Sequence, residues 1–133
     1  MKLRGRTIYR GQARGEALVT RMGISFFGGV DPDSGQIVEK GHELEGQFIG
    51  GRILVFPSGK GSTVGSYTLY RLKKNGLAPA AILNAECETI TAVGCIIAEI
   101  PCIDQIAIGQ IHTGDRVIVD GDSGIVQILP PGD

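Results

Sequence analysis

The chain has 133 residues, of which 42% are hydrophobic and 20% are charged. This balance predicts a single folded domain over residues 1–133 and excludes an intrinsically disordered chain. A formal net charge of −1 gives no general attraction to nucleic acid or to a membrane surface, and no signal peptide or apolar span of membrane length is recognisable. Because the three cysteines form no CxxC motif, we expect a cytoplasmic protein.

The N-terminal segment is basic, since its first 21 residues hold six Lys or Arg residues and one acid. We expect short strands around Leu3 and Ile8 and at residues 17–19, with a loop at residues 10–15 between them. Basic side chains in such a cluster are usually solvated. Arg14, however, lies in this glycine-containing loop, and a planar guanidinium suits a phosphate or carboxylate. Arg14 is therefore a candidate ligand of an anionic substrate.

Residues 25–45 combine aromatic residues with an acidic turn. Phe26 and Phe27 are expected to enter the core. The Asp31-Pro-Asp-Ser-Gly stretch is typical of a turn, because Asp side chains accept hydrogen bonds from backbone N–H groups two residues on. We expect this acidic region to be exposed. His42 has no second ligand at metal-binding spacing, so it is also expected at the surface.

The pattern around residues 52–76 is the most informative in the chain. Residues 52–56 are an apolar run of β-formers, which predicts a buried strand that ends at Pro57. Residues 64–75 have helical periodicity, and Gly76 is placed to end that helix. A glycine-rich loop therefore enters a helix at Ser62 and Thr63, where free backbone N–H groups and the helix dipole favour an anion.

Three interpretations of this loop are open. In the first, Ser62 or Thr63 is only a helix cap, although neither has Glu or Gln three residues later to complete a capping box. In the second, the loop is a nucleotide P-loop; the spacing contradicts it, because Gly61 follows Lys60 and Leu54 occupies the place of the first glycine. In the third, the loop binds an anion and presents a reactive serine.

The second half of the chain predicts further β and α elements. We expect a buried strand at residues 80–83, a polar turn at 84–88, a short helix at 90–94 and a strand at 95–100. Asp120-Gly121 predicts a hairpin between two terminal strands. The fold class is thus α/β, a β/β/α domain with a mixed sheet or part-barrel of short strands and packed helices. Seven and six residues separate Cys87, Cys95 and Cys102, and without a short spacing we predict no metal site in this chain.

Five segments together resemble the small subunit of the aconitase X family, and the resemblance covers nearly the whole chain. They are residues 25–32, 57–63, 84–86, 100–104 and 114–121. The resemblance implies a swivelling domain like the mobile, serine-bearing domain of aconitase. It also implies that the chain docks on a separate large subunit, which holds a [4Fe-4S] cluster, and that no cofactor is bound by this chain alone.

The resemblance further implies a hydro-lyase that acts on a small phosphorylated hydroxy acid. The substrate would be (R)-5-phosphomevalonate, converted to trans-anhydromevalonate 5-phosphate in an archaeal mevalonate route to isoprenoids; hydroxyproline, the substrate of fused bacterial relatives, is the alternative. The family's serine base corresponds to Ser62. By proximity to the loop, Lys60, the backbone of Gly61 and Thr63, and Arg14 are candidate contacts to the substrate phosphate.

Two other functions are possible for such a sequence. Residues 119–130 also resemble the phosphohistidine swivelling domain of enzymes that transfer phosphate through pyruvate or phosphoenolpyruvate. That chemistry needs a histidine beside a glycine-rich turn, whereas His112 is far from the loop along the chain. A shared fold does not determine the chemistry. The remaining alternative is a non-catalytic scaffold subunit.

Overall fold

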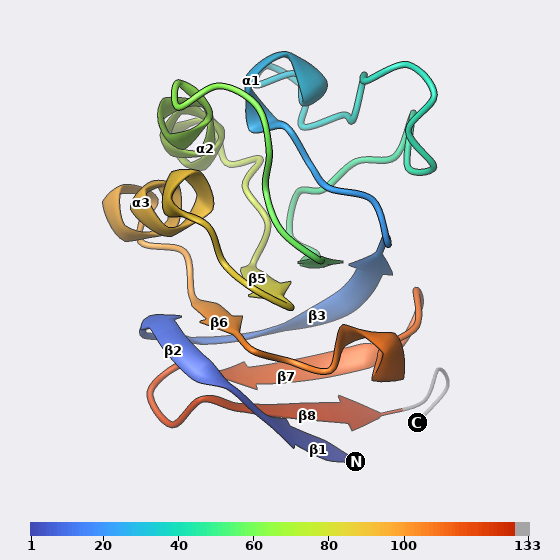
Figure 1. The fold of residues 1–133 in the computed structure, drawn as a ribbon, viewed down its shortest axis with the longest axis vertical. Helices are drawn as coiled ribbons and strands as arrows, with labels where there is room; N and C mark the ends of the chain where they lie inside the picture. The colour runs from blue at the N-terminus through green and yellow to red at the C-terminus, as the bar shows by residue number, and fades with distance from the viewer. Residues whose placement is uncertain (130–133) are drawn as a thin grey trace.

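The computed structural model describes residues 1–129 and contains, over that range, one eight-stranded mixed sheet with helices packed on it (Figure 1). The helices are α1 (Phe26–Gly29), α2 (Gly65–Lys74), α3 (Thr89–Ala98) and the 3-10 helix η1 (Ile108–Gln110). The strands are β1 (Lys2–Arg4), β2 (Arg6–Tyr9), β3 (Gln12–Val19), β4 (Ile53–Phe56), β5 (Ala81–Asn84), β6 (Cys102–Asp104), β7 (Arg116–Asp120) and β8 (Ile125–Leu129).

The sheet curves until its two ends are joined by a single residue. Its strand order is β1-β8-β7-β3-β4-β5-β6-β2, so consecutive strands β1 and β2 lie at opposite ends, and Gly5 connects them. A Cβ atom on Gly5 would collide with the Asp104 carbonyl oxygen and the Ile106 side chain, so only glycine fits this corner. The predicted β/β/α domain with a part-barrel of short strands is confirmed.

Strands β3, β4, β5 and β6 run parallel to one another. Their carboxyl ends therefore meet at one edge of the sheet, and the segments that follow them lie side by side. These segments begin at Thr20, Pro57, Ala85 and Gln105. The loop that carries Ser62 leaves the sheet from β4 at this edge and leads into α2 (Figure 1).

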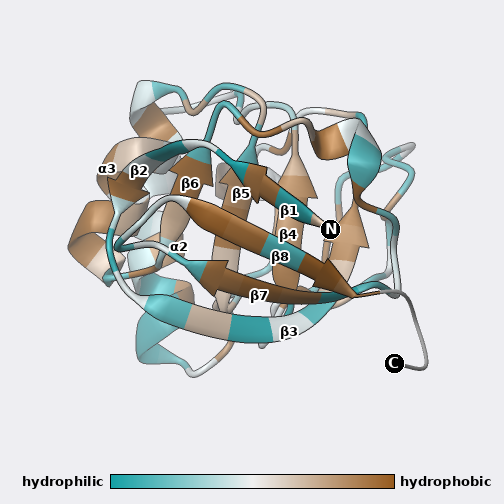
Figure 2. Cartoon of the chain, turned by 90° about the horizontal axis from the view of Figure 1, so that it is seen from below, coloured by the Kyte–Doolittle hydropathy of each residue, from teal (hydrophilic) through white to brown (hydrophobic). Residues whose placement is uncertain are grey.

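Strand β4 divides the hydrophobic core into two parts. All four of its residues are buried, because both faces of the sheet are covered. Leu54 and Phe56 pack with the helices, whereas Ile53 and Val55 pack inside the barrel with residues of β7 and β8. Those strands are hydrophobic for most of their length (Figure 2). The alternation fixes the register of β4 and therefore the point at which the loop starts.

Residues 95–98 are helical, so the predicted strand at residues 95–100 is wrong. They form the last turn of α3, which ends at Glu99 in a left-handed conformation (φ 55°). The strand that follows is β6, which begins at Cys102. The error has a physical cause: a short apolar run such as Cys95-Ile-Ile-Ala98 is compatible with a buried strand or with a helix, and periodicity alone does not distinguish them.

The loop predicted at residues 10–15 is shorter than expected, because β3 begins at Gln12 and only residues 10–11 separate it from β2. Residues 12–16 pair with β7, so most of the predicted loop belongs to a regular strand whose partner lies 100 to 108 positions later in the chain. The strands predicted around Leu3 and Ile8 and the terminal hairpin are confirmed. Phe26 is buried as expected, but the expectation for Phe27 is wrong: it is 53% exposed, at a point where the backbone of α1 departs from helical angles.

Candidate functional site

Residues 57–64, here called the serine loop, are held firmly at their beginning and exposed at their tip. Backbone hydrogen bonds join Ile24 N–H to Ser58 (3.4 Å), Lys60 N–H to Ile24 (3.0 Å) and Glu86 N–H to Pro57 (3.0 Å). Residues 60–64, by contrast, are all exposed. The loop is therefore a surface feature with a fixed base, at the carboxyl edge of the parallel strands.

The Ser62 hydroxyl lies at the amino end of α2. Its Oγ accepts a hydrogen bond from the Val64 N–H (3.1 Å), and the side chain faces solvent rather than the core. Within residues 1–129, the N–H groups of Gly61, Ser62 and Thr63 donate to no protein acceptor. Backbone donors and the positive end of the α2 dipole thus converge on the tip, which favours negative charge there.

Both glycines that flank Lys60 are required by close contacts. A Cβ on Gly59 would collide with the carboxylate of Glu88 and the hydroxyl of Thr91, and one on Gly61 would collide with the Ser25 hydroxyl. Gly61 also has a φ of +88°, which residues other than glycine rarely adopt. The Gly59 N–H donates to Glu88 Oε1 (3.1 Å), and the same carboxylate caps α3 at Ile90 and Thr91. Glu88 therefore links the serine loop to α3.

Lys60 comes two residues before Ser62, and its ammonium group is paired with Glu39. The Nζ–Oε2 distance is 3.0 Å, and the side chains are 47% and 28% exposed. A pair this open to solvent contributes at most about 1 kcal/mol. Its ammonium group can therefore exchange Glu39 for a substrate anion at little cost.

The other predicted substrate contacts are placed differently. Thr63 follows Ser62 at the loop tip and lines a hollow between α2 and α3. Arg14 is exposed in the first half of β3, opposite Ile118 of β7, and lines a separate hollow with Gly114 and Arg116. Since Val19 marks the end of β3, Arg14 lies about 16 Å back along the strand. Lys60, Gly61, Ser62 and Thr63 are consecutive residues of the serine loop, whereas Arg14 lies apart from them on β3.

His42 is buried, so its predicted surface position is wrong. Its side chain is only 4% exposed, with Nε2 at 3.0 Å from the Gly23 carbonyl and Nδ1 accepting the Leu44 N–H at 3.0 Å. It holds together two loops near the carboxyl edge. No local signal marks this role, because Gly23 and His42 are brought together only by the tertiary fold.

The fold gathers the three cysteines, which the sequence spacing does not indicate. The Cys87 and Cys102 sulfur atoms are 4.0 Å apart, and Cys95 on the inner face of α3 and Cys102 of β6 are fully buried in the same core cluster. The hydrogen bond with Cys102 and burial raise the pKa of the Cys87 thiol well above its ordinary value, so it stays protonated at neutral pH. Within residues 1–129, no set of three Cys, His, Asp or Glu side chains is arranged to hold a metal ion. These thiols do not fit an iron–sulfur cluster.

An ion pair between the exposed Arg6 and the buried Asp104 lies at the carboxyl edge of the parallel strands, and sequence analysis missed it. Arg6 donates to both carboxylate oxygens of Asp104 (2.9 and 2.8 Å), and Asp104 also accepts the Cys87 N–H (2.9 Å). Burial alone would raise the pKa of Asp104, but these hydrogen bonds and the charge of Arg6 outweigh it and hold that pKa below its ordinary value. The pair joins β2 to β6 where the sheet ends.

Comparison with known proteins resolves the choice between families. The family model of the aconitase X swivel domain matches residues 2–128. The chain belongs to the aconitase X swivel domain family. His112, the residue that a phosphohistidine domain would need, is exposed near η1 and is not part of the serine loop.

Similar proteins align with this aconitase X swivel domain over nearly its whole sequence. It is 53% identical to the phosphomevalonate dehydratase small subunit of Thermococcus kodakarensis, over 100% of both chains, and 53% identical to that of Methanosarcina acetivorans, over 98% of this chain and 93% of the relative. The crystal structure of Thermococcus kodakaraensis aconitase X in its holo-form superposes with a TM-score of 0.95 at 53% identity, covering 97% of this chain and 98% of the other. Over residues 1–129, no helix has the length and hydrophobicity needed to cross a membrane.

Proposed function

We propose that this chain is the small subunit of a phosphomevalonate dehydratase and that Ser62 supplies its base. The reaction is the loss of water from (R)-5-phosphomevalonate to give trans-anhydromevalonate 5-phosphate. Relatives with about half of their residues identical carry this name over the full length of the chain. The observation that carries the assignment of the base is the exposed Ser62 hydroxyl, whose oxygen accepts a backbone N–H at the amino end of α2.

The loop geometry suits removal of a proton next to a carboxylate. Ser62 can act only as an alkoxide, which is strongly disfavoured in water. The Val64 N–H and the α2 dipole both stabilise negative charge on Oγ, and they do so more strongly once a partner excludes water. The proton taken from the substrate carbon then leaves with the hydroxyl group as water, which restores the alkoxide.

This chain would contribute the base and an anion site, and the large subunit would contribute the rest. The [4Fe-4S] cluster of the family is assigned to the large subunit, in agreement with the poor fit of Cys87, Cys95 and Cys102 to a cluster. The complex would be cytoplasmic and would need neither nucleic acid nor a membrane. This chain alone is expected to be inactive.

Lys60 and the backbone amides of Gly61 to Thr63 are the proposed contacts to the substrate phosphate. These four consecutive residues belong to the exposed tip of the loop, and the ammonium group of Lys60 is held only by an exposed ion pair. Arg14 is left out, because β3 holds it away from the loop.

The test of the base is the Ser62→Ala variant in the complex with the large subunit from the same genome. We expect turnover to fall at least ~100-fold, the usual scale for a general base. Exchange of the substrate's α-proton with deuterated solvent should fall by a similar factor, because it reports proton removal directly. Anaerobic assays on 5-phosphomevalonate and hydroxyproline, side by side, identify the substrate.

Ser58→Ala is the matched control, since Ser58 belongs to the same loop and only its carbonyl group is hydrogen-bonded. It should keep normal turnover. A cap role predicts a different outcome for Ser62→Ala: a loss of about 1 kcal/mol in the free energy of unfolding with turnover unchanged. That outcome would remove Ser62 from the chemistry.

A further inference from the structure

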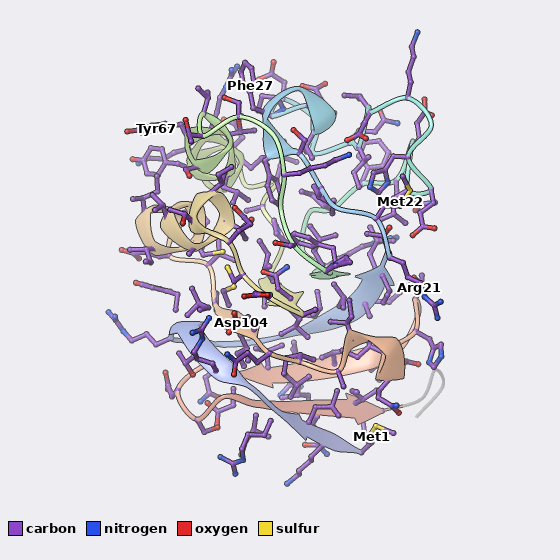
Figure 3. All side chains as sticks on the ribbon, in the orientation of Figure 1. Met1, Arg21, Met22, Phe27, Tyr67 and Asp104 are labelled. Carbon is purple, nitrogen blue, oxygen red and sulfur yellow. The ribbon has the colours of Figure 1, made fainter. Side chains whose placement is uncertain are left out.

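Large exposed apolar side chains gather around the serine loop. Phe27 (53% exposed), Val64 (45%) and Tyr67 (70%) surround the start of α2, and Val93 (41%) lies on the facing side of α3. Phe27 and Tyr67 point outward next to one another from α1 and α2 (Figure 3). Isolated exposed hydrophobic residues are common on proteins, whereas a group of this size next to a functional loop indicates a contact surface.

Two shallow hollows make this group one continuous surface. The first, of about 480 Å³, lies between α1 and α2 and includes Phe27 and Val38. The second, of about 250 Å³, lies between α2 and α3 and includes Thr63 and Val93. Val64 and Tyr67 line both hollows, so they form a ridge between them. Ser62 is two residues from this ridge.

Helix α3 extends the same surface and has the composition of a covered helix. None of its ten residues is charged, and it is hydrophobic for most of its length (Figure 2). One side packs on α2 and the sheet through Thr91, Gly94 and Cys95, but Val93, Ile96 and Ile97 remain 38–50% exposed. A surface helix normally carries charged residues on its outer face, and a helix that is apolar all round is normally buried.

We propose that this surface, defined by Phe27, Val64, Tyr67, Val93, Ile96 and Ile97, is where the large subunit docks, with Tyr67 and Phe27 as its anchors. The inference rests on the proposed function, because the base must face a substrate held by the partner. Aromatic side chains in hollows are the usual anchors of protein interfaces. Two charged side chains line the first hollow, and both have partners within this chain: Arg71 pairs with Asp33 at 2.8 Å, and Asp31 accepts hydrogen bonds from the Asp33 N–H and the Ser34 hydroxyl. The surface therefore makes no demand for a charged partner.

A second copy of this chain is the alternative occupant, and the position of Ser62 disfavours it. A symmetric pair through this surface would press two serine loops together and exclude the substrate from both. The relatives are also named as small subunits, which implies a larger partner rather than a self-assembly. We therefore expect the isolated chain to sediment as a monomer.

The experiment measures the dissociation constant of the full chain with its large subunit for Phe27→Asp, Tyr67→Asp and Phe48→Asp. Phe48 is the matched control, because it is 52% exposed and lines neither hollow. We expect at least ~10-fold weaker binding for the first two variants, as for interface anchors, and wild-type binding for the third. At saturating large subunit, turnover should recover. Circular dichroism checks that each variant is folded.

The outcomes separate the docking surface from the base. Ser62→Ala should bind the large subunit normally and fail in turnover, whereas Tyr67→Asp should bind weakly and turn over when saturated. Equal binding by Phe27→Asp, Tyr67→Asp and the wild type would overturn the docking surface and leave the base untouched. A stable dimer of the isolated chain that Tyr67→Asp dissociates would assign the surface to self-association and overturn the proposal.

Discussion

Lys60 pairs with Glu39 in the isolated chain, and mutation of either residue tests whether Lys60 binds the substrate phosphate. If the ammonium group moves to the substrate phosphate, Lys60→Ala should raise KM about 10-fold, the scale of one charge-assisted hydrogen bond, with kcat nearly unchanged. Glu39→Gln removes the competitor, so KM should stay equal or fall. Steady-state kinetics of the assembled enzyme give both values.

Arg14→Ala is the comparison for this prediction. It removes an exposed arginine that the fold places on β3, away from the loop, and should leave KM unchanged. An increase in KM for Arg14→Ala, with none for Lys60→Ala, would show that the phosphate lies elsewhere.

The structural position of a single residue could be predicted from the sequence where its near neighbours in the chain determine that position. Ser62 and Gly61 were predicted correctly at the entrance to a helix, because a glycine-rich turn followed by helical periodicity is a local signal. His42 was not, since its partner Gly23 is 19 positions away. The Arg6–Asp104 pair spans 98 positions and has no local signal either.

At the scale of elements, the carboxylate of Glu88 connects α3 to the serine loop. Mutation of Glu88 tests this connection. Glu88→Ala removes the cap of α3 and the acceptor for the Gly59 N–H together. We expect a loss of about 1–3 kcal/mol in the free energy of unfolding, from a cap and one further hydrogen bond. Urea unfolding measures the loss, and faster amide exchange at Gly59 and Ile90 locates it.

Glu86→Ala is the control, because that exposed carboxylate lies two residues earlier and only its backbone N–H is bonded to the loop. It should change stability by less than about 0.5 kcal/mol. Equal stability and equal exchange in both variants would mean that α3 and the loop are independent.

Element types were predictable where length and pattern agreed. The helix predicted at residues 64–75 is found at Gly65–Lys74, with Gly76 in the left-handed conformation that ends it. The strand predicted at residues 95–100 failed because the outer face of α3 is as apolar as its inner face. A helix whose outer face is apolar has no polar stripe, and that stripe is the pattern by which an amphipathic helix is recognised in a sequence.

At the scale of the whole molecule, closure of the sheet depends on Gly5. Gly5→Ala would drive a methyl group into the Asp104 carbonyl and Ile106, so we expect a loss of about 1–3 kcal/mol in the free energy of unfolding, typical of overpacking. Gly109→Ala is the matched control, because a Cβ there meets nothing within 4 Å. Thermal unfolding of the two variants decides between them: equal melting temperatures would contradict the tight corner.

The fold class could be predicted from the sequence, but the closure of the sheet at Gly5 could not. Many short strands and glycines favoured a part-barrel, and the Asp120-Gly121 hairpin gave one of its strand pairs. The order of the strands depends on pairings between distant segments, such as Gln12 with Asp120, which composition does not encode. The single domain over residues 1–133 remains a prediction, and residues 130–133 lie outside the described part of the chain.

The pairing of β1 with β8 has a consequence for synthesis. Leu3 of β1 pairs with Val126 of β8, so β1 cannot find its partner until β8 has been translated and has left the ribosome. The barrel therefore stays open until β8 has emerged, and its hydrophobic interior can close only then. Until then the unpaired strands and the hydrophobic interior of the nascent chain are exposed, and such surfaces favour aggregation.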